Sequence, residues 1–78
     1  MNIQDEVYRL VANYIGKKTG DIKDSDRLVE DLGLDDIDVV DLILDIEDKC
    51  AVGIPDDDMA GINTLGELVK AVEKGAES

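Results

Sequence analysis

Apolar residues spaced three or four positions apart constrain the fold of this chain more than any other feature of its sequence. The first segment places five residues on one face of a helix: Ile3, Val7, Leu10, Val11 and Tyr14. Asn2 can cap the start of this helix, because its side chain can accept a hydrogen bond from a free backbone amide. Gly16 suits its end. The sequence therefore predicts a first helix between these two residues.

A long connection is predicted from Gly16 to Asp35, where the helical spacing is lost. Apolar residues still recur in it, and we expect them to hold it on the core: Ile22, Leu28, Val29, Leu32 and Leu34. Connections longer than about 12 to 15 residues in compact domains are usually functional or disordered. The apolar anchors favour an ordered and functional connection.

The segment from Asp36 to Lys49 mixes acids with aliphatic residues at helical spacing, which predicts a second helix. Its core face is expected to consist of Val39, Leu42, Ile43 and Ile46. A neighbouring strip holds Ile37, Val40 and Leu44. Acids flank this strip at Asp38, Asp41, Asp45, Glu47 and Asp48. Aliphatic residues among so many acids favour a surface for partner proteins over a merely solvated face.

The remaining chain predicts a short helical turn and a final helix. Pro55 stops regular structure because it lacks the backbone donor, so only a brief turn is expected at 56–60. Thr64 and Glu67 have the spacing of a capping box. The final helix then has a buried stripe and is expected to end before Gly75; the stripe is Leu65, Leu68, Val69 and Val72.

No segment alternates apolar and polar residues with the period of a strand, so the predicted fold class is all-α. Three longer helices, one short helix and a long loop between the first two form the simplest bundle that buries every stripe. The chain has 78 residues and lacks Trp and Phe, so its core must be aliphatic. We expect residues 1–78 to form a single domain, because a chain of this length supplies only one core.

The formal net charge is −12, with only eight Lys and Arg residues, which argues against nucleic-acid binding. Basic protein surfaces are the expected partners.

The single cysteine excludes an internal disulfide, and no apolar run reaches the roughly 20 residues of a membrane span. These features predict a soluble, cytoplasmic protein. A monomer is expected, because the exposed aliphatic strip is short and flanked by charge.

Catalytic motifs are missing from the sequence, so we expect no enzyme activity. Without histidine, the chain cannot assemble a Ser-His-Asp or Cys-His arrangement or a His-Glu-x-x-His metal site. Asp56, Asp58, Gly61 and Glu67 follow part of the spacing of a calcium loop, but Ala60 replaces an oxygen ligand. We favour a short helix followed by a capping box, and predict no dedicated metal site.

Cys50 has helical spacing from Ile43 and Ile46. No cluster of basic residues that would activate a thiol lies near it in the sequence. It is predicted to act as a small buried hydrophobic residue.

The stretch Glu30-Asp31-Leu32-Gly33-Leu34-Asp35-Asp36-Ile37-Asp38 resembles the acyl carrier proteins of fatty acid and polyketide synthesis. The similarity continues through the acidic second helix with Val40, Leu42 and Glu47, the turn at Ile54-Pro55-Asp56 and the capped final helix. It implies an acyl-carrier-like four-helix bundle. It also implies an aliphatic interior between the second and third helices that can sheath an acyl chain, lined by Val39, Ile43, Ile46, Ile54, Ile62 and Leu68.

The family motif Asp-Ser-Leu reads Asp35-Asp36-Ile37 in this chain. In the family, that serine hydroxyl forms a phosphodiester to 4'-phosphopantetheine, whose thiol carries the acyl group. A carboxylate cannot form this phosphodiester, so attachment is not possible at Asp36. Two explanations of Asp36 stay open at this point: a cap for the second helix, or a purposeful change whose charge partly mimics the modified serine.

The resemblance also implies partners for the acidic second helix. These are basic surfaces of fatty acid or polyketide synthase enzymes and of the phosphopantetheinyl transferase. The residues expected to meet them are Asp35, Ile37, Asp38, Val40, Asp41, Leu44, Glu47 and Asp48.

The leading hypothesis is an acyl carrier scaffold that presents a tethered acyl chain to its enzymes and here lacks the attachment serine. The alternative is an unmodified regulatory or interaction protein that docks on the same enzymes. Asp36 fits either a substitution that blocks modification of an ordinary carrier or a natural protein that works unmodified.

The excess of acids leads to a first prediction. Added NaCl or MgCl2 screens the repulsion among the 20 acidic residues, so the melting temperature is expected to rise with either salt. Thermal melts followed by circular dichroism measure this. A melting temperature that falls steadily as magnesium is added would contradict it.

Overall fold

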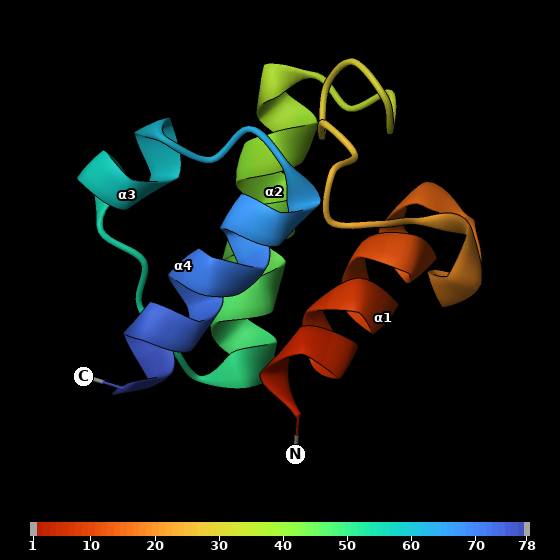
Figure 1. Ribbon diagram of the computed structural model, residues 1–78. Coiled ribbons are helices and arrows are strands. Elements are labelled where there is room, and N and C mark those ends of the chain that lie inside the picture. Colours follow the sequence, from red (N-terminus) through yellow and green to blue (C-terminus); the bar gives the residue numbers. More distant parts are fainter. Residues whose placement is uncertain (1, 78) are drawn as a thin grey trace.

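A computed structural model describes residues 2–77 and contains four α-helices and one short 3-10 turn (Figure 1). Helix α1 spans Ile3–Ile15, α2 spans Asp36–Cys50, α3 spans Asp56–Ala60 and α4 spans Leu65–Glu77, while η1 covers Thr19–Asp21. Helices α1, α2 and α4 contact one another, and α3 lies to one side of them (Figure 1). The predicted all-α bundle, with three longer helices and one short helix, is confirmed.

The core is a single cluster of aliphatic side chains from α1, α2, α4, the long connection and the segment between α2 and α3. Its buried members are Val7, Leu10, Val11, Ala12, Ile22, Leu28, Leu34, Leu42, Ile43, Ile46, Ile54, Leu65, Leu68, Val69 and Val72. The predicted stripe of α4 is therefore fully buried. On α2 the prediction holds for Leu42, Ile43 and Ile46, whereas Val39 is half-buried at the edge of the cluster.

Helix α1 has the predicted ends. The Asn2 side chain accepts a hydrogen bond from the Asp5 amide at 3.3 Å, and Gly16 adopts the left-handed conformation at φ 74°. Tyr14 differs from the prediction, because 40% of it is exposed. Its hydroxyl reaches across to α2 and donates a 3.4 Å hydrogen bond to the Asp38 carboxylate. An aromatic side chain with a polar tip can lie at a rim in this way, where an aliphatic residue would be buried.

The long connection is ordered, as predicted, and Ile22, Leu28 and Leu34 anchor it in the core. Leu32 packs against the cluster from its edge. Val29 was expected to be an anchor as well, but 44% of it is exposed. In an irregular segment, the sequence gives no period from which the direction of a side chain could be predicted.

Backbone hydrogen bonds join this connection to the start of α4. The amides of Leu65 and Gly66 donate to the carbonyls of Asp26 and Asp24 at 2.9 and 3.0 Å, and the Leu28 amide donates to Asn63 at 2.9 Å. A Cβ atom at Gly66 would lie 3.1 Å from that of Asp24, so glycine permits the close approach. Two amides of the first turn of α4, which have no partner within the helix, are thus satisfied by the connection.

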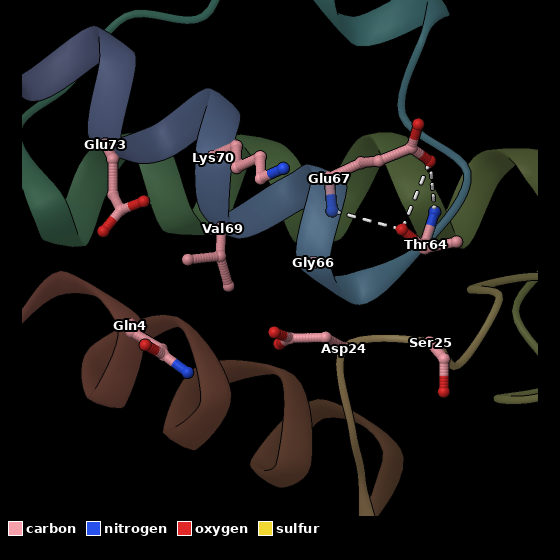
Figure 2. Close-up of a pocket in the computed structure, with 9 residues that line it drawn as sticks. All are labelled: Gln4, Asp24, Ser25, Thr64, Gly66, Glu67, Val69, Lys70 and Glu73. Carbon is pink, nitrogen blue, oxygen red and sulfur yellow. Dashed lines mark hydrogen bonds between the residues drawn. The ribbon is translucent and has the colours of Figure 1, made fainter.

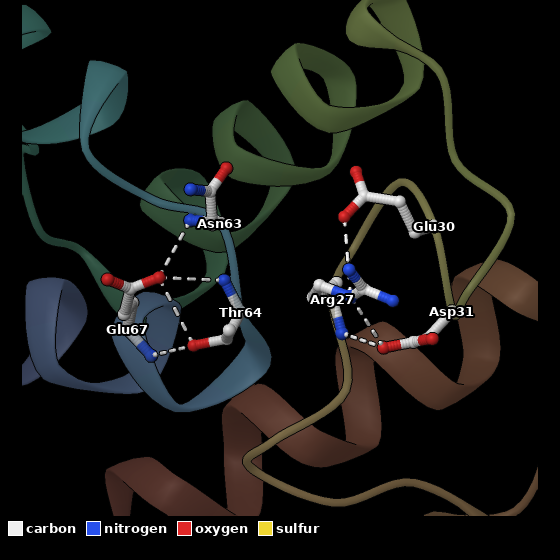
Figure 3. Close-up of polar contacts among 6 residues, drawn as sticks. All are labelled: Arg27, Glu30, Asp31, Asn63, Thr64 and Glu67. Atoms are coloured by element: carbon white, nitrogen blue, oxygen red, sulfur yellow. Dashed lines mark hydrogen bonds and ion pairs between the residues drawn. The ribbon is translucent and has the colours of Figure 1, made fainter.

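The capping box of α4 is confirmed (Figure 3). The Glu67 amide donates to the Thr64 hydroxyl at 3.1 Å, while the Glu67 carboxylate accepts from the amides of Thr64 and Asn63 at 2.9 and 3.0 Å. Opposite it, the Arg27 side chain lies between Glu30 and Asp31, at 3.3 and 3.2 Å (Figure 3). These contacts fix both sides of the junction between the connection and α4.

The sequence predicted that α4 ends before Gly75, but the helix continues to Glu77. Gly75 faces the segment that follows α2, and a Cβ atom there would lie 3.0 Å from the Gly53 carbonyl oxygen. The glycine therefore permits close packing within a helix, and its identity is explained without a helix end.

The capping box makes stability depend on pH through Glu67. Hydrogen bonds from the amides of Thr64 and Asn63 lower the pKa of the Glu67 carboxyl from its usual value. Because the pKa of Glu67 is lower in the folded than in the unfolded chain, its ionised carboxylate stabilises the fold at pH values above the unfolded pKa of about 4.3. This stabilisation is lost as the pH falls through the pKa of Glu67 in the folded chain. Glu67→Gln should therefore melt at a lower temperature than the native chain at pH 7, with the difference shrinking towards pH 3.

The matched control is Glu73→Gln, because Glu73 is exposed on the same helix and makes no hydrogen bond or ion pair within residues 2–77. Its melting temperature should follow that of the native chain across the same pH range. A Glu67→Gln difference that stays constant from pH 7 to pH 3 would show that the charge of Glu67 does not stabilise the cap.

Candidate functional site

The start of α2 is organised around Asp35. Its carboxylate accepts a hydrogen bond from the Asp38 amide at 2.8 Å, and the Asp38 carboxylate accepts one from the Asp35 amide at 3.3 Å. These reciprocal bonds form a capping box in which Asp35 is the N-cap. Asp36 is the first residue inside the helix, so the interpretation of Asp36 as the cap is wrong.

The Asp36 side chain is exposed and makes no hydrogen bond or ion pair with any other residue from 2 to 77. Its only structural contribution is its negative charge in the first turn of α2, where the helix dipole favours an acid. Capping does not require an aspartate at this position, because Asp35 already satisfies the amide that a cap would serve.

A cleft of about 300 Å³ opens beside Asp36, between the long connection, α2 and α3. Polar and apolar groups share its lining, which comprises Leu28, Val29, Glu30, Asp36, Val39, Val40, Met59, Ala60, Ile62 and Asn63. Among these lining residues there is no hydroxyl or thiol that could replace the missing serine. The donor set at this site therefore does not fit covalent attachment of phosphopantetheine.

The aliphatic interior implied for the family is present only in part. Val39 and Ile62 line the cleft. The other four expected residues, Ile43, Ile46, Ile54 and Leu68, are buried in the core cluster. The space available to a chain therefore lies at the outer edge of the bundle, next to α3.

The predicted aliphatic strip of α2 is exposed. Ile37 is 73% exposed, Val40 50% and Leu44 53%, and they follow one another at intervals of three and four residues. Val29 of the long connection adds a further exposed apolar side chain, and it lines the cleft together with Val40. Val40 therefore belongs to both the exposed strip and the lining of the cleft. The sequence did not reveal the contribution of Val29, because its exposure depends on how the connection folds.

The acids of α2 differ in the hydrogen bonds and ion pairs that they already make within the chain. Asp41 and Asp48 are exposed and make no hydrogen bond or ion pair within the described chain. Asp45 pairs with Lys49 at 2.7 Å, an exposed pair of the kind that contributes little to stability. Asp35 and Asp38 hold the cap, so a partner meets them in fixed positions.

Glu47, expected among the partner-binding residues, has a structural contact of its own. Its carboxylate accepts a 2.7 Å hydrogen bond from the amide of Ile54, whose side chain is buried in the core. This bond spans the end of α2, where Ala51 adopts a left-handed conformation at φ 56°. Glu47 therefore holds the segment between α2 and α3 in place.

A second groove, of about 510 Å³, lies between α1, α4 and the connection (Figure 2). Ser25 and Thr64 line it together with the acids Asp24, Glu67 and Glu73. The chain's hydroxyl groups at Ser25 and Thr64 therefore belong to this groove and not to the cleft beside Asp36. Tyr8 donates a hydrogen bond to Asp24 here, and burial followed by this bond raises the pKa of Tyr8 to about 12.

The partial calcium spacing does not produce a calcium loop. Asp56 and Asp58 lie in helix α3, and Asp58 is 3.7 Å from Lys74. Glu67, the last acid of the pattern, is engaged in the capping box. Among residues 2–77 no three potential ligands gather in a group that could hold a metal ion.

Cys50 was predicted to be buried and is half-buried, packed against the edge of the core. Burial, and then the charge of Glu6, raise the pKa of its thiol, which disfavours a reactive thiolate.

Within the described chain, every helix is too short or too polar to cross a membrane.

The model of the phosphopantetheine attachment site family matches residues 5–72. The chain belongs to this family of acyl carrier proteins. It is 36% identical over 73 residues to an acyl carrier protein of Sulfurovum sp., covering 94% of this chain and 97% of that one. It is 33% identical to an acyl carrier protein of Thermotoga maritima, covering 95% of this chain and 96% of the relative.

The fold agrees with the same family. A solved structure of the acyl carrier protein from Enterococcus faecalis superposes with a TM-score of 0.77 at 25% identity, covering 94% of this chain and 92% of that one. The family's cofactor is 4'-phosphopantetheine, as the resemblance implied. This chain is thus an acyl carrier scaffold with a carboxylate at the start of α2.

The capping geometry predicts different costs for the two neighbouring acids. Asp35→Ala should lower the free energy of unfolding by about 1 kcal/mol, because the Asp38 amide loses its partner. Asp36→Ala should lower it by only a few tenths of a kcal/mol, the scale of a charge near a helix end. Urea unfolding of both variants measures this, and equal losses would contradict the assignment of Asp35 as the cap.

Proposed function

We propose that this chain is the acyl carrier scaffold of a fatty acid or polyketide synthesis system, with an intact docking face and a blocked attachment position. The docking face consists of the strip Ile37, Val40 and Leu44 with the acids Asp35, Asp38, Asp41, Glu47 and Asp48. The exposure of three aliphatic residues in a row among acids carries this proposal. Solvated surfaces rarely keep such a strip without a partner.

The partners we propose are basic surfaces of synthase enzymes and of the phosphopantetheinyl transferase. The net charge of −12 supports this, because opposite charges steer association and raise its rate at low ionic strength. Asp41 and Asp48 are the acids most available to a partner, since they make no contact that binding would have to break. Asp35 and Asp38 present fixed charges beside Ile37.

At Asp36 the scaffold lacks the hydroxyl that the family loads. We propose that the chain docks in an unloaded form, and that serine at position 36 is sufficient to make it a carrier. The relatives it matches over almost their whole length are acyl carrier proteins, which favours the carrier scaffold over a separate regulatory class of protein.

Further properties follow from this proposal. Residues 1–78 act as one domain, the chain is monomeric and cytoplasmic, and it has no catalytic activity of its own. The single aliphatic core supports one domain, and the short exposed strip flanked by acids supports a monomer.

The proposal predicts the outcome of a loading experiment. The chain and its Asp36→Ser variant are each incubated with coenzyme A, magnesium and a broad-specificity phosphopantetheinyl transferase, then measured by intact-protein mass spectrometry. The serine variant should gain the mass of one phosphopantetheine, and the native chain should remain unchanged. No gain in either would contradict a carrier scaffold, and a gain in the native chain would contradict a blocked position.

The docking face has its own control in the same assay. Val40→Glu in the Asp36→Ser background places a charge in the middle of the strip and should slow loading at least several-fold. Glu73→Gln in the same background alters an exposed acid on α4 and should leave the loading rate within about two-fold of the parent. Equal loading rates for the two variants would show that the strip is not part of the docking face.

A further inference from the structure

Helix α3 has five residues and lies to one side of the other three helices (Figure 1). None of its residues is buried, and its N-cap, Pro55, makes no side-chain capping bond. Asp58 pairs with Lys74 at 3.7 Å, but Lys74 is exposed, and such pairs contribute little to stability. Isolated helices shorter than about 12 residues are barely stable in water. The position of α3 therefore depends on a side chain that packs against the core.

Met59 is the residue of α3 that makes this contact. It is half-buried and packs against the core cluster, whereas the three aspartates of α3 and Ala60 do not. On either side of the helix, the chain is held by Ile54, which is buried, and by Ile62, which packs at the edge of the core. Helix α3 is thus fixed at both ends and has one apolar contact between them.

A methionine in this position is open to oxidation. Met59 also lines the cleft between the connection, α2 and α3, so a solute as small as hydrogen peroxide can reach it in the folded chain. The thioether sulfur attacks one peroxide oxygen, so that an S–O bond forms as the O–O bond breaks, and the released hydroxide takes up a proton and leaves as water. Sulfur is oxidised by two electrons and the peroxide is reduced. The product, methionine sulfoxide, is polar and disfavours burial in an apolar contact.

We infer that Met59 is a modification site for peroxide, and that its oxidation releases α3 from the core. The sulfoxide puts a polar group on the one side chain of α3 that packs there, while Ile54 and Ile62 keep their places. The change is reversible, because reductases convert methionine sulfoxide back to methionine. The docking face contains no methionine, and the inference does not rest on docking or on loading of position 36.

The test treats the native chain and Met59→Leu with hydrogen peroxide, at a concentration that oxidises free N-acetylmethionine amide. Peptide mass spectrometry locates each added oxygen, and NMR follows amide hydrogen exchange. The reporters are the amides of Met59, Gly61 and Ile62, which donate to the carbonyls of Pro55, Asp58 and Met59. After oxidation of the native chain they should exchange roughly five- to ten-fold faster, whereas the amides of α1 and α4 should change less than about two-fold.

Met59→Leu is the matched control, because leucine preserves the apolar volume and has no sulfur. It also carries the chain's other methionine, Met1, which lies outside the described residues. Its α3 amides should exchange at one rate before and after peroxide. Met59→Gln, which holds a polar group at the same place, should show the faster exchange without peroxide. Methionine sulfoxide reductases for both epimers should restore slow exchange to the oxidised native chain.

Several results would overturn the inference. One is a Met59 that peroxide leaves intact in the folded chain, and another is a Met59 sulfoxide with unchanged exchange in α3. The same acceleration in Met59→Leu would assign the effect to a different residue. Equal acceleration in α1 and α4 would show that the whole chain unfolds and that α3 is not released locally.

Discussion

The rest of the structure depends on the backbone hydrogen bonds between the long connection and the first turn of α4. Leu65 and Gly66 donate to the carbonyls of Asp26 and Asp24, and Leu28 donates to Asn63. A connection of this length would lose considerable conformational entropy on ordering, and these bonds offset part of that cost together with burial of its anchors. The Leu28 carbonyl in turn accepts a 3.1 Å hydrogen bond from the Leu34 amide, which links the chain just before Asp36 to this junction.

The helices were predictable because each carries a repeated apolar stripe. Spacing alone was enough to assign Leu42, Ile43 and Ile46 to the core. It also placed Ile37, Val40 and Leu44 on a separate strip, which is exposed. The direction of Val29 could not be predicted, because an irregular segment has no period. Gly75 was misinterpreted for a similar reason, since a helix end and a close helix contact both favour glycine, and only the position of Gly53 distinguishes them.

The sequence predicted where α2 begins and which of its aliphatic residues are exposed, but not the structural roles of the acids around them. The motif located the start of α2, but the sequence analysis considered only Asp36 as its cap, whereas the cap is Asp35. That choice depends on backbone geometry, which puts the Asp38 amide within 2.8 Å of Asp35. The role of Glu47 was hidden for the same reason, because its partner is a backbone amide seven residues away.

The absence of a partner for Asp36 within the described chain separates folding from chemistry at one position. The neighbouring Asp35 supports the helix, so residue 36 can change without rebuilding its surroundings. A surface position that the fold does not use is free to be altered by selection or by an engineer, in either direction. The same scaffold can therefore exist as a loadable or a permanently unloaded protein, and the two forms would compete for every enzyme that recognises their shared surface.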